Sequence, residues 1–97
     1  MIMTYKLILK SNAHKDLAEA IEYYQSKRKG LGLRFLKCVQ KFFDRITKSP
    51  HHYPLKSNNF REAYIQKFPY VIIYEIIDKE VVVFSVFNTH QNQTKKP

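Results

Sequence analysis

The sequence predicts an α+β domain in which an antiparallel sheet is covered on one face by a helical hairpin. Short stretches rich in Ile, Val, Phe and Tyr occur near both ends of the chain, and such residues suit a pleated, partly buried sheet. Between them, apolar residues recur at helical spacing over two stretches that a short glycine-containing segment separates. The predicted order is therefore β-α-α-β-β-β.

Residues 5–10 form the first predicted strand, because apolar and lysine side chains largely alternate along them. Ser11 or Asn12 then offers a side-chain oxygen that can cap a helix N-terminus. Apolar residues recur at helical spacing from Ala13 onwards, and Asp16 lies favourably near the positive end of the helix dipole. The first helix is therefore expected to begin at about Ala13.

Both glycines of the chain, Gly30 and Gly32, interrupt this pattern, and Gly30 can adopt the left-handed conformation that ends a helix. A second helix is predicted to follow, as far as about Lys48. Its apolar face includes Phe43, which we expect to be buried between helix and sheet. Cys38 lies on the same face, so we expect a small buried side chain rather than a reactive thiol.

The opposite side of the second predicted helix carries basic residues at steps of three and four. These residues are Arg34, Lys37, Lys41, Arg45 and Lys48. One interpretation is a solvated surface, which we favour slightly because Asp44 interrupts the stripe. The other is a track for phosphate groups, in which Lys37, Lys41 and Arg45 would bind nucleic acid.

Residues 49–59 are predicted to form a loop, since Pro50 and Pro54 preclude a continued helix. The loop contains His51 and His52, but adjacent histidines point in different directions. No cluster of Cys or carboxylates completes a set of four ligands, so the sequence predicts no metal site. No cofactor-binding motif occurs at a recognised spacing either.

Residues 60–87 predict a three-stranded antiparallel meander, because three β-prone stretches are joined by short connections. Pro69 has no backbone donor and marks the first bend, and Asp78-Lys79 marks the second.

Three tyrosines, Tyr64, Tyr70 and Tyr74, alternate with aliphatic residues in this meander. We favour a place for them in the core with the hydroxyl at its edge, over a role in stacking on bases.

The composition indicates one domain over residues 1–90, followed by a polar and mobile tail at 91–97. The formal charge of +9 favours a polyanionic partner, such as nucleic acid or an acidic polypeptide, over a merely soluble basic protein. We expect no membrane span and no signal peptide, and the single cysteine fits a reducing cytoplasm.

One ordered set of segments resembles the RelE/ParE family of bacterial toxins. The set consists of Arg61-Glu62-Ala63-Tyr64, Phe68-Pro69-Tyr70, Tyr74-Glu75-Ile76 and residues 81–87. The resemblance implies the same β-α-α-β-β-β fold and the role of toxin in a type II toxin–antitoxin pair of the plasmid-stabilization type. It implies a cytoplasmic protein that a cognate antitoxin neutralises. We expect that antitoxin to be acidic and partly disordered.

The family offers two mechanisms. RelE-like members cut mRNA in the ribosome, whereas ParE-like members are not nucleases and poison DNA gyrase by binding it. The first hypothesis for this chain is a RelE-like, ribosome-dependent endoribonuclease. The alternative is a ParE-like gyrase inhibitor, or a toxin whose catalysis has lapsed and that binds only its antitoxin.

Cleavage of RNA by its own 2′-hydroxyl needs a proton acceptor, a cation for the growing phosphate charge and an acid for the leaving oxygen. Arg61 matches the family's strand arginine and could supply the cation, or it could instead pair with Glu62 or with an antitoxin carboxylate. Asn88 stands where many members have a catalytic histidine, and an amide cannot exchange protons near neutral pH. His90 could replace that histidine, although we favour a solvated tail residue.

Overall fold

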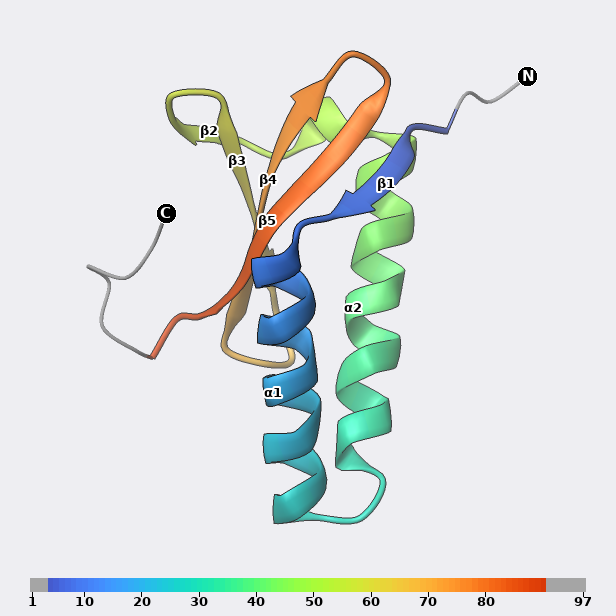
Figure 1. Cartoon of the computed structure of the whole chain (residues 1–97), viewed down its shortest axis with the longest axis vertical. Helices are drawn as coiled ribbons and strands as arrows, with labels where there is room; N and C mark the ends of the chain where they lie inside the picture. The colour runs from blue at the N-terminus through green and yellow to red at the C-terminus, as the bar shows by residue number, and fades with distance from the viewer. Residues whose placement is uncertain (1–3, 91–97) are drawn as a thin grey trace.

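The computed structural model describes residues 4–90 (Figure 1). Its elements are β1 (Lys6–Leu9), α1 (Ser11–Lys27), α2 (Leu31–Lys48), a short 3₁₀ helix η1 (Pro50–His52), β2 (Leu55–Ser57), β3 (Phe60–Ile65), β4 (Tyr70–Ile77) and β5 (Glu80–Asn88). The two helices form a hairpin that packs against one side of the sheet, which confirms the predicted α+β fold. The predicted tail at 91–97 lies outside the described residues.

The five strands are arranged in the order β1-β5-β4-β3-β2. Strands β3, β4 and β5 form the predicted antiparallel meander, with bends at Pro69 and at Asp78-Lys79. Strand β1 pairs in parallel with the first half of β5, from Lys6 opposite Glu80 to Leu9 opposite Val83, so the sheet is mixed. No local pattern in β1 encodes this direction, because the pairing depends on where the helical hairpin returns the chain.

The prediction that residues 49–59 form only a loop was wrong. This segment contains η1 and the short edge strand β2, which pairs antiparallel with β3. All three residues of β2 are exposed. The strand therefore shows no alternation of apolar and polar residues by which the sequence could reveal it.

Helix α1 begins at Ser11, and the predicted cap by Ser11 or Asn12 is wrong. Lys10 occupies the N-cap position, and no side chain caps the helix. The Asn12 side chain instead donates a hydrogen bond to the Phe84 carbonyl, at 3.3 Å. The helix start is thus linked directly to β5.

The two glycines have different roles in the helical hairpin. Gly30 has φ +87°, in the left-handed region, and is the N-cap of α2. Gly32 is buried, and a Cβ placed there would lie 2.7 Å from the carbonyl oxygen of Ile21 on α1. The absence of a side chain at Gly32 therefore permits close packing of the two helices.

The hydrophobic core lies between the helices and the sheet. Phe43 is 7% exposed, which confirms its predicted burial, and Tyr70 and Tyr74 are also buried in this core. The core prediction was wrong for Tyr64, which is half exposed, because its side chain alternates to the opposite face of β3. It was also wrong for Cys38, which is only partly buried at the margin of the helix's apolar face.

Within residues 4–90, no helix has the length and apolar character needed to cross a membrane. The same residues contain no group of three or more His, Cys, Asp or Glu side chains that could hold a metal ion.

Candidate functional site

Arg61 lies on the side of β3 that faces the helices, because its side chain shares the parity of the core residues Ala63 and Ile65. Its guanidinium donates hydrogen bonds to the Tyr53 carbonyl at 2.6 Å and to the His51 carbonyl at 3.3 Å. Both acceptors belong to the segment that connects α2 to β2. The charged group therefore fastens this connection to the sheet.

A tyrosine on the neighbouring strand fastens the same connection. Tyr74 lies directly opposite Arg61 in the sheet, and its buried hydroxyl donates a hydrogen bond to the Pro50 carbonyl at 2.6 Å. Burial raises the pKa of Tyr74 above its usual range, although the nearby Arg61 charge lowers it in part. The hydroxyl is therefore held in its neutral, donating form.

Asn88 and His90 lie at the other end of the sheet. Asn88 pairs with Tyr70, whereas Arg61 pairs with Tyr74, which is four residues further along β4. Strand geometry therefore separates the Arg61 and Asn88 backbones by about 16 Å. The exposed His90 is joined to Asn88 only by its backbone N–H, which donates to Asn88 Oδ1 at 2.8 Å. The structure does not bring Arg61 together with the other two predicted catalytic residues.

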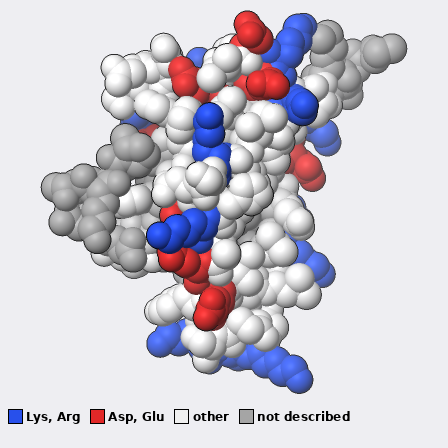
Figure 2. Space-filling view, in the orientation of Figure 1, with Lys and Arg blue, Asp and Glu red and all other residues white. Residues whose placement is uncertain are grey.

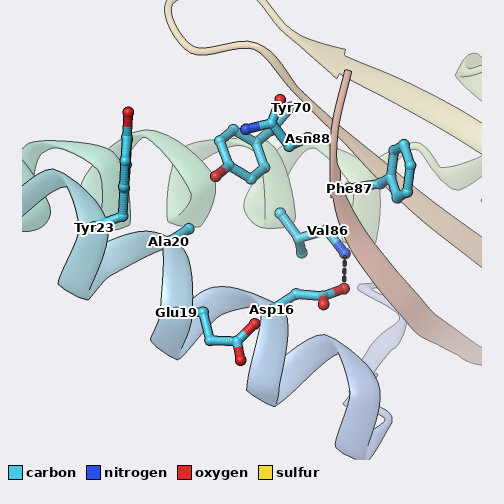
Figure 3. Close-up of a pocket in the computed structure, with 8 residues that line it drawn as sticks. All are labelled: Asp16, Glu19, Ala20, Tyr23, Tyr70, Val86, Phe87 and Asn88. Atoms are coloured by element: carbon cyan, nitrogen blue, oxygen red, sulfur yellow. Dashed lines mark hydrogen bonds between the residues drawn. The ribbon is translucent and has the colours of Figure 1, made fainter. Parts of the chain in front are cut away.

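Asn88 lines a cavity of about 380 Å³ between α1 and the end of β5 (Figure 3). The other residues around this cavity are Asp16, Glu19, Ala20, Tyr23, Tyr70, Val86 and Phe87. Figure 3 shows the Tyr70 ring beside Asn88, with the two carboxylates projecting from α1. Burial raises the pKa of Tyr70, and the hydrogen bond from Asn88 lowers it in part.

Beside this cavity the Asp16 carboxylate is bound by two residues of β5, a contact that the sequence analysis did not predict. Its Oδ2 accepts hydrogen bonds from Ser85 Oγ at 2.8 Å and from the Val86 backbone N–H at 3.0 Å. Strand β1 pairs with β5 only as far as Val83, so the next residues of β5 have no strand partner on that edge. The carboxylate therefore takes the place of a missing strand. Because α1 begins at Ser11 and its first turn holds no acidic residue, the predicted favourable position of Asp16 near the helix dipole was wrong.

The three α2 residues predicted to bind nucleic acid share one surface. Lys37, Lys41 and Arg45 are exposed and line a groove of about 580 Å³ between α2 and the turn that joins β3 to β4. The remaining residues of this groove, hereafter the α2 groove, are Leu31, Arg34, Cys38, Phe42, Gln66, Lys67 and Phe68. Arg61, the fourth predicted nucleic-acid ligand, lies elsewhere.

The sheet face that points away from the helices carries a second, smaller apolar cluster. Val71, Ile73 and Phe87 are buried there, with Phe60 packed against them. On the same face the Tyr64 hydroxyl donates to a Glu62 carboxylate oxygen at 2.9 Å. Arg61 and Asn88 are on the other side of the sheet, so this face holds neither of these two predicted catalytic residues.

Charge is distributed unevenly over the molecule. Figure 2 shows one face, on which carboxylates and basic side chains alternate over α1. The acidic residues of that helix are Asp16, Glu19 and Glu22. The α2 groove, by contrast, includes five basic residues and no acidic one.

The chain matches the family model of the ParE toxin of the type II toxin–antitoxin system parDE, over residues 7–93. A comparison with curated protein sequences gives no match.

Several solved structures are similar to the chain, and three of them are described here. The chromosomal ParDE toxin–antitoxin system from P. aeruginosa matches with a TM-score of 0.78 at 12% identity, over 89% of this chain and 97% of the other. The RelBE2 toxin–antitoxin complex from Mycobacterium tuberculosis matches with a TM-score of 0.65 at 22% identity, over 91% and 94%. The isolated E. coli RelE toxin matches with a TM-score of 0.67 at 20% identity, over 94% and 90%.

At these identities, the structural matches establish a shared fold and no shared activity. The family model covers nearly the whole chain, including both helices, strands β2 to β5 and all of β1 except its first residue. The chain therefore belongs to the ParE family of toxins of type II toxin–antitoxin systems.

Proposed function

We propose that this chain is a toxin that acts by binding its target, as ParE-like members bind DNA gyrase, and not by cutting RNA. The observation that carries the proposal is the position of Arg61. Its guanidinium donates to two backbone carbonyls on the core side of the sheet, and strand geometry separates the Arg61 backbone from that of Asn88 by about 16 Å. A phosphate cannot contact that cation and a proton-transfer group near Asn88 at the same time.

The chemistry of the groups near the end of β5 also supports binding. Asn88 cannot give or accept a proton near neutral pH, and burial raises the pKa of Tyr70, so its phenol stays protonated there. His90 carries an imidazole, but its side chain is exposed. A cleavage site built from these residues would lack a phosphate-binding cation beside its proton donor.

The ParE family membership further supports a protein target, and it supports a cognate antitoxin that neutralises the toxin. The proposed place of action is the cytoplasm, because the chain would meet both gyrase and its antitoxin there. Co-expression with the adjacent open reading frame, followed by purification through a tag on either chain, tests this pairing. Recovery of the toxin alone, without rescue of growth, would argue against it.

The decisive assay for the target compares gyrase with programmed ribosomes. We expect the purified chain to inhibit supercoiling of relaxed plasmid by gyrase and to leave ribosome-bound mRNA intact. The Asn88→His variant should leave mRNA intact as well, because restoring an imidazole does not move Arg61 across the sheet. Cleavage of ribosome-bound mRNA by the parent chain, with unimpeded supercoiling, would refute the proposal.

A ribosome-dependent endoribonuclease remains the second candidate, because the five basic residues of the α2 groove could track a phosphate backbone. Under this hypothesis Lys37, Lys41 and Arg45 would bind RNA, and Arg61, Asn88 and His90 would contribute to cleavage. Asn88→His should then raise the rate of cleavage by about 10²–10⁴-fold, the usual contribution of general acid–base catalysis. The same mRNA assay therefore distinguishes the two candidates.

A further inference from the structure

The α2 groove combines an uncompensated positive rim with an apolar floor. Arg34, Lys37, Lys41 and Arg45 follow one side of α2 at steps of three and four residues, and Lys67 faces them from the turn between β3 and β4. In Figure 1 this turn lies at the end of the sheet, beside the helices. Residues far apart in the sequence therefore enclose one depression.

Within residues 4–90, none of these five cationic heads forms an ion pair or a hydrogen bond with another side chain. The Arg45 guanidinium lies over the Phe42 ring, 5.2 Å from its centroid. Five like charges around one groove repel one another, and an anionic occupant relieves that repulsion. The nearest acidic residue in sequence, Asp44, is not part of the lining.

The apolar floor of the groove favours an acidic polypeptide over a nucleic acid as its occupant. Arg45 already covers one face of the Phe42 ring, and the Phe68 ring packs edge-on against Tyr24 and Phe35, with centroids 5.0 and 5.1 Å away. These contacts already occupy part of both rings, which disfavours the stacking of bases on them. Cys38 lines the same groove as a small, partly buried apolar side chain. Such a floor suits an inserted aliphatic or aromatic side chain.

We propose that the α2 groove binds an acidic polypeptide segment, which seats one large apolar side chain between Cys38, Phe42 and Phe68 and places carboxylates against the surrounding lysines and arginines. Both the net positive rim and the apolar floor contribute to this recognition, as in other peptide-binding grooves. The inference rests on the proposed function in one respect: the antitoxin is the partner that would supply this segment.

The chain's single cysteine provides a direct test, because Cys38 lines the floor of the groove. The probe is a short synthetic peptide in which glutamates flank a central Leu-Phe pair. Its matched control carries Ser-Ser at the centre. We expect saturating probe to slow the reaction of Cys38 with a maleimide by at least about tenfold, because a seated side chain excludes the reagent. An unchanged rate under saturating probe would overturn the proposal.

Charge reversal tests the rim independently of the thiol. The combined Lys37→Glu and Lys41→Glu change should weaken probe binding by at least about tenfold, as measured by fluorescence anisotropy. The matched control is Lys56→Glu with Lys79→Glu, which changes the net charge equally at exposed positions outside the groove. Equal weakening by both pairs would mean that only net charge attracts the peptide, and would overturn the proposal. Circular dichroism checks the fold of each variant.

A single-stranded RNA serves as the competing probe. If RNA protects Cys38 and the acidic peptide does not, the groove is a nucleic-acid site and the proposal fails. The gyrase assay separates this failure from that of the proposed function. A chain that inhibits gyrase but shows no protection of Cys38 refutes the groove inference alone, whereas a chain that binds the peptide but spares gyrase refutes only the proposed target.

Discussion

Asp16→Ala is expected to destabilise the fold by about 2–3 kcal/mol, because Asp16 ties α1 to the unpaired edge of β5. Its carboxylate accepts two hydrogen bonds, from Ser85 Oγ at 2.8 Å and from the Val86 N–H at 3.0 Å. A hydrogen bond to a charged group contributes about 1.5–3 kcal/mol, and a buried donor left without a partner adds its desolvation cost. Ser85 is only 2% exposed, so its hydroxyl would lose contact with water as well as with the carboxylate.

The loss of stability expected for Asp16→Ala is smaller than the sum for two hydrogen bonds to a charged group, for a structural reason. The cavity beside Asp16 has room for water, which can hydrate the Val86 N–H after the carboxylate is removed. Asp16→Asn retains an acceptor of similar shape without the charge, and should cost about 1 kcal/mol. The three proteins should therefore fall in a fixed order of stability: parent, Asn variant, Ala variant.

Urea denaturation followed by circular dichroism measures these differences as shifts of the midpoint at constant slope. Glu19→Ala is the matched control, because Glu19 is exposed on the same helix and lines the same cavity. It should change the stability by no more than about 0.5 kcal/mol. An Asp16→Ala variant as stable as the Glu19→Ala control would refute the role assigned to the carboxylate.

Three further predictions concern the core, the helical hairpin and the connection to β2. Phe43→Ala should cost about 3–5 kcal/mol as a truncation of a buried aromatic residue, and a melting temperature within a few degrees of the parent would contradict the burial of Phe43. Gly32→Ala should cost about 1–3 kcal/mol of stability in a urea titration, because its Cβ would meet the Ile21 carbonyl oxygen at 2.7 Å. Gly30→Ala should cost less, because its Cβ would meet no atom and only the backbone φ of +87° would be strained. Burial raises the pKa of Tyr74 above its unfolded value of 10.0, so the stability contributed by its neutral hydroxyl is complete below about pH 10 and should be lost as pH rises further. Tyr74→Phe should lack this part of the alkaline decline, and identical pH profiles of the two proteins would contradict it.

Local patterns in the sequence were sufficient to predict both helices and the meander of β3, β4 and β5. The apolar spacing along α2 places Phe43 in the core, and Pro69 and Asp78 mark the bends of the meander correctly. Strand β2 could not be predicted in this way, because its residues are all exposed and its pairing with β3 is a tertiary contact. The parallel pairing of β1 with β5 could not be predicted either, because it is also a tertiary contact.

The predicted site illustrates a different limit. Strand alternation places Arg61 on the same side as Ala63 and Ile65, so its position on the core side could have been inferred from the sequence. The partners of its guanidinium could not, because the Tyr53 carbonyl reaches it only through the fold of η1 and the residues after it. Lys67 and Phe68 likewise join the basic stripe of α2 only in the folded chain.

The central claim, that this toxin binds its target without catalysis, is tested most directly by the stoichiometry of its action. Purified chain is titrated against a fixed amount of gyrase with relaxed plasmid, and in parallel against ribosomes programmed with a labelled mRNA. A binding toxin should inhibit supercoiling only as its amount approaches that of gyrase, and should leave the mRNA full length at every ratio. Loss of mRNA at amounts of chain far below those of the ribosomes, with supercoiling unaffected, would show turnover and contradict the claim.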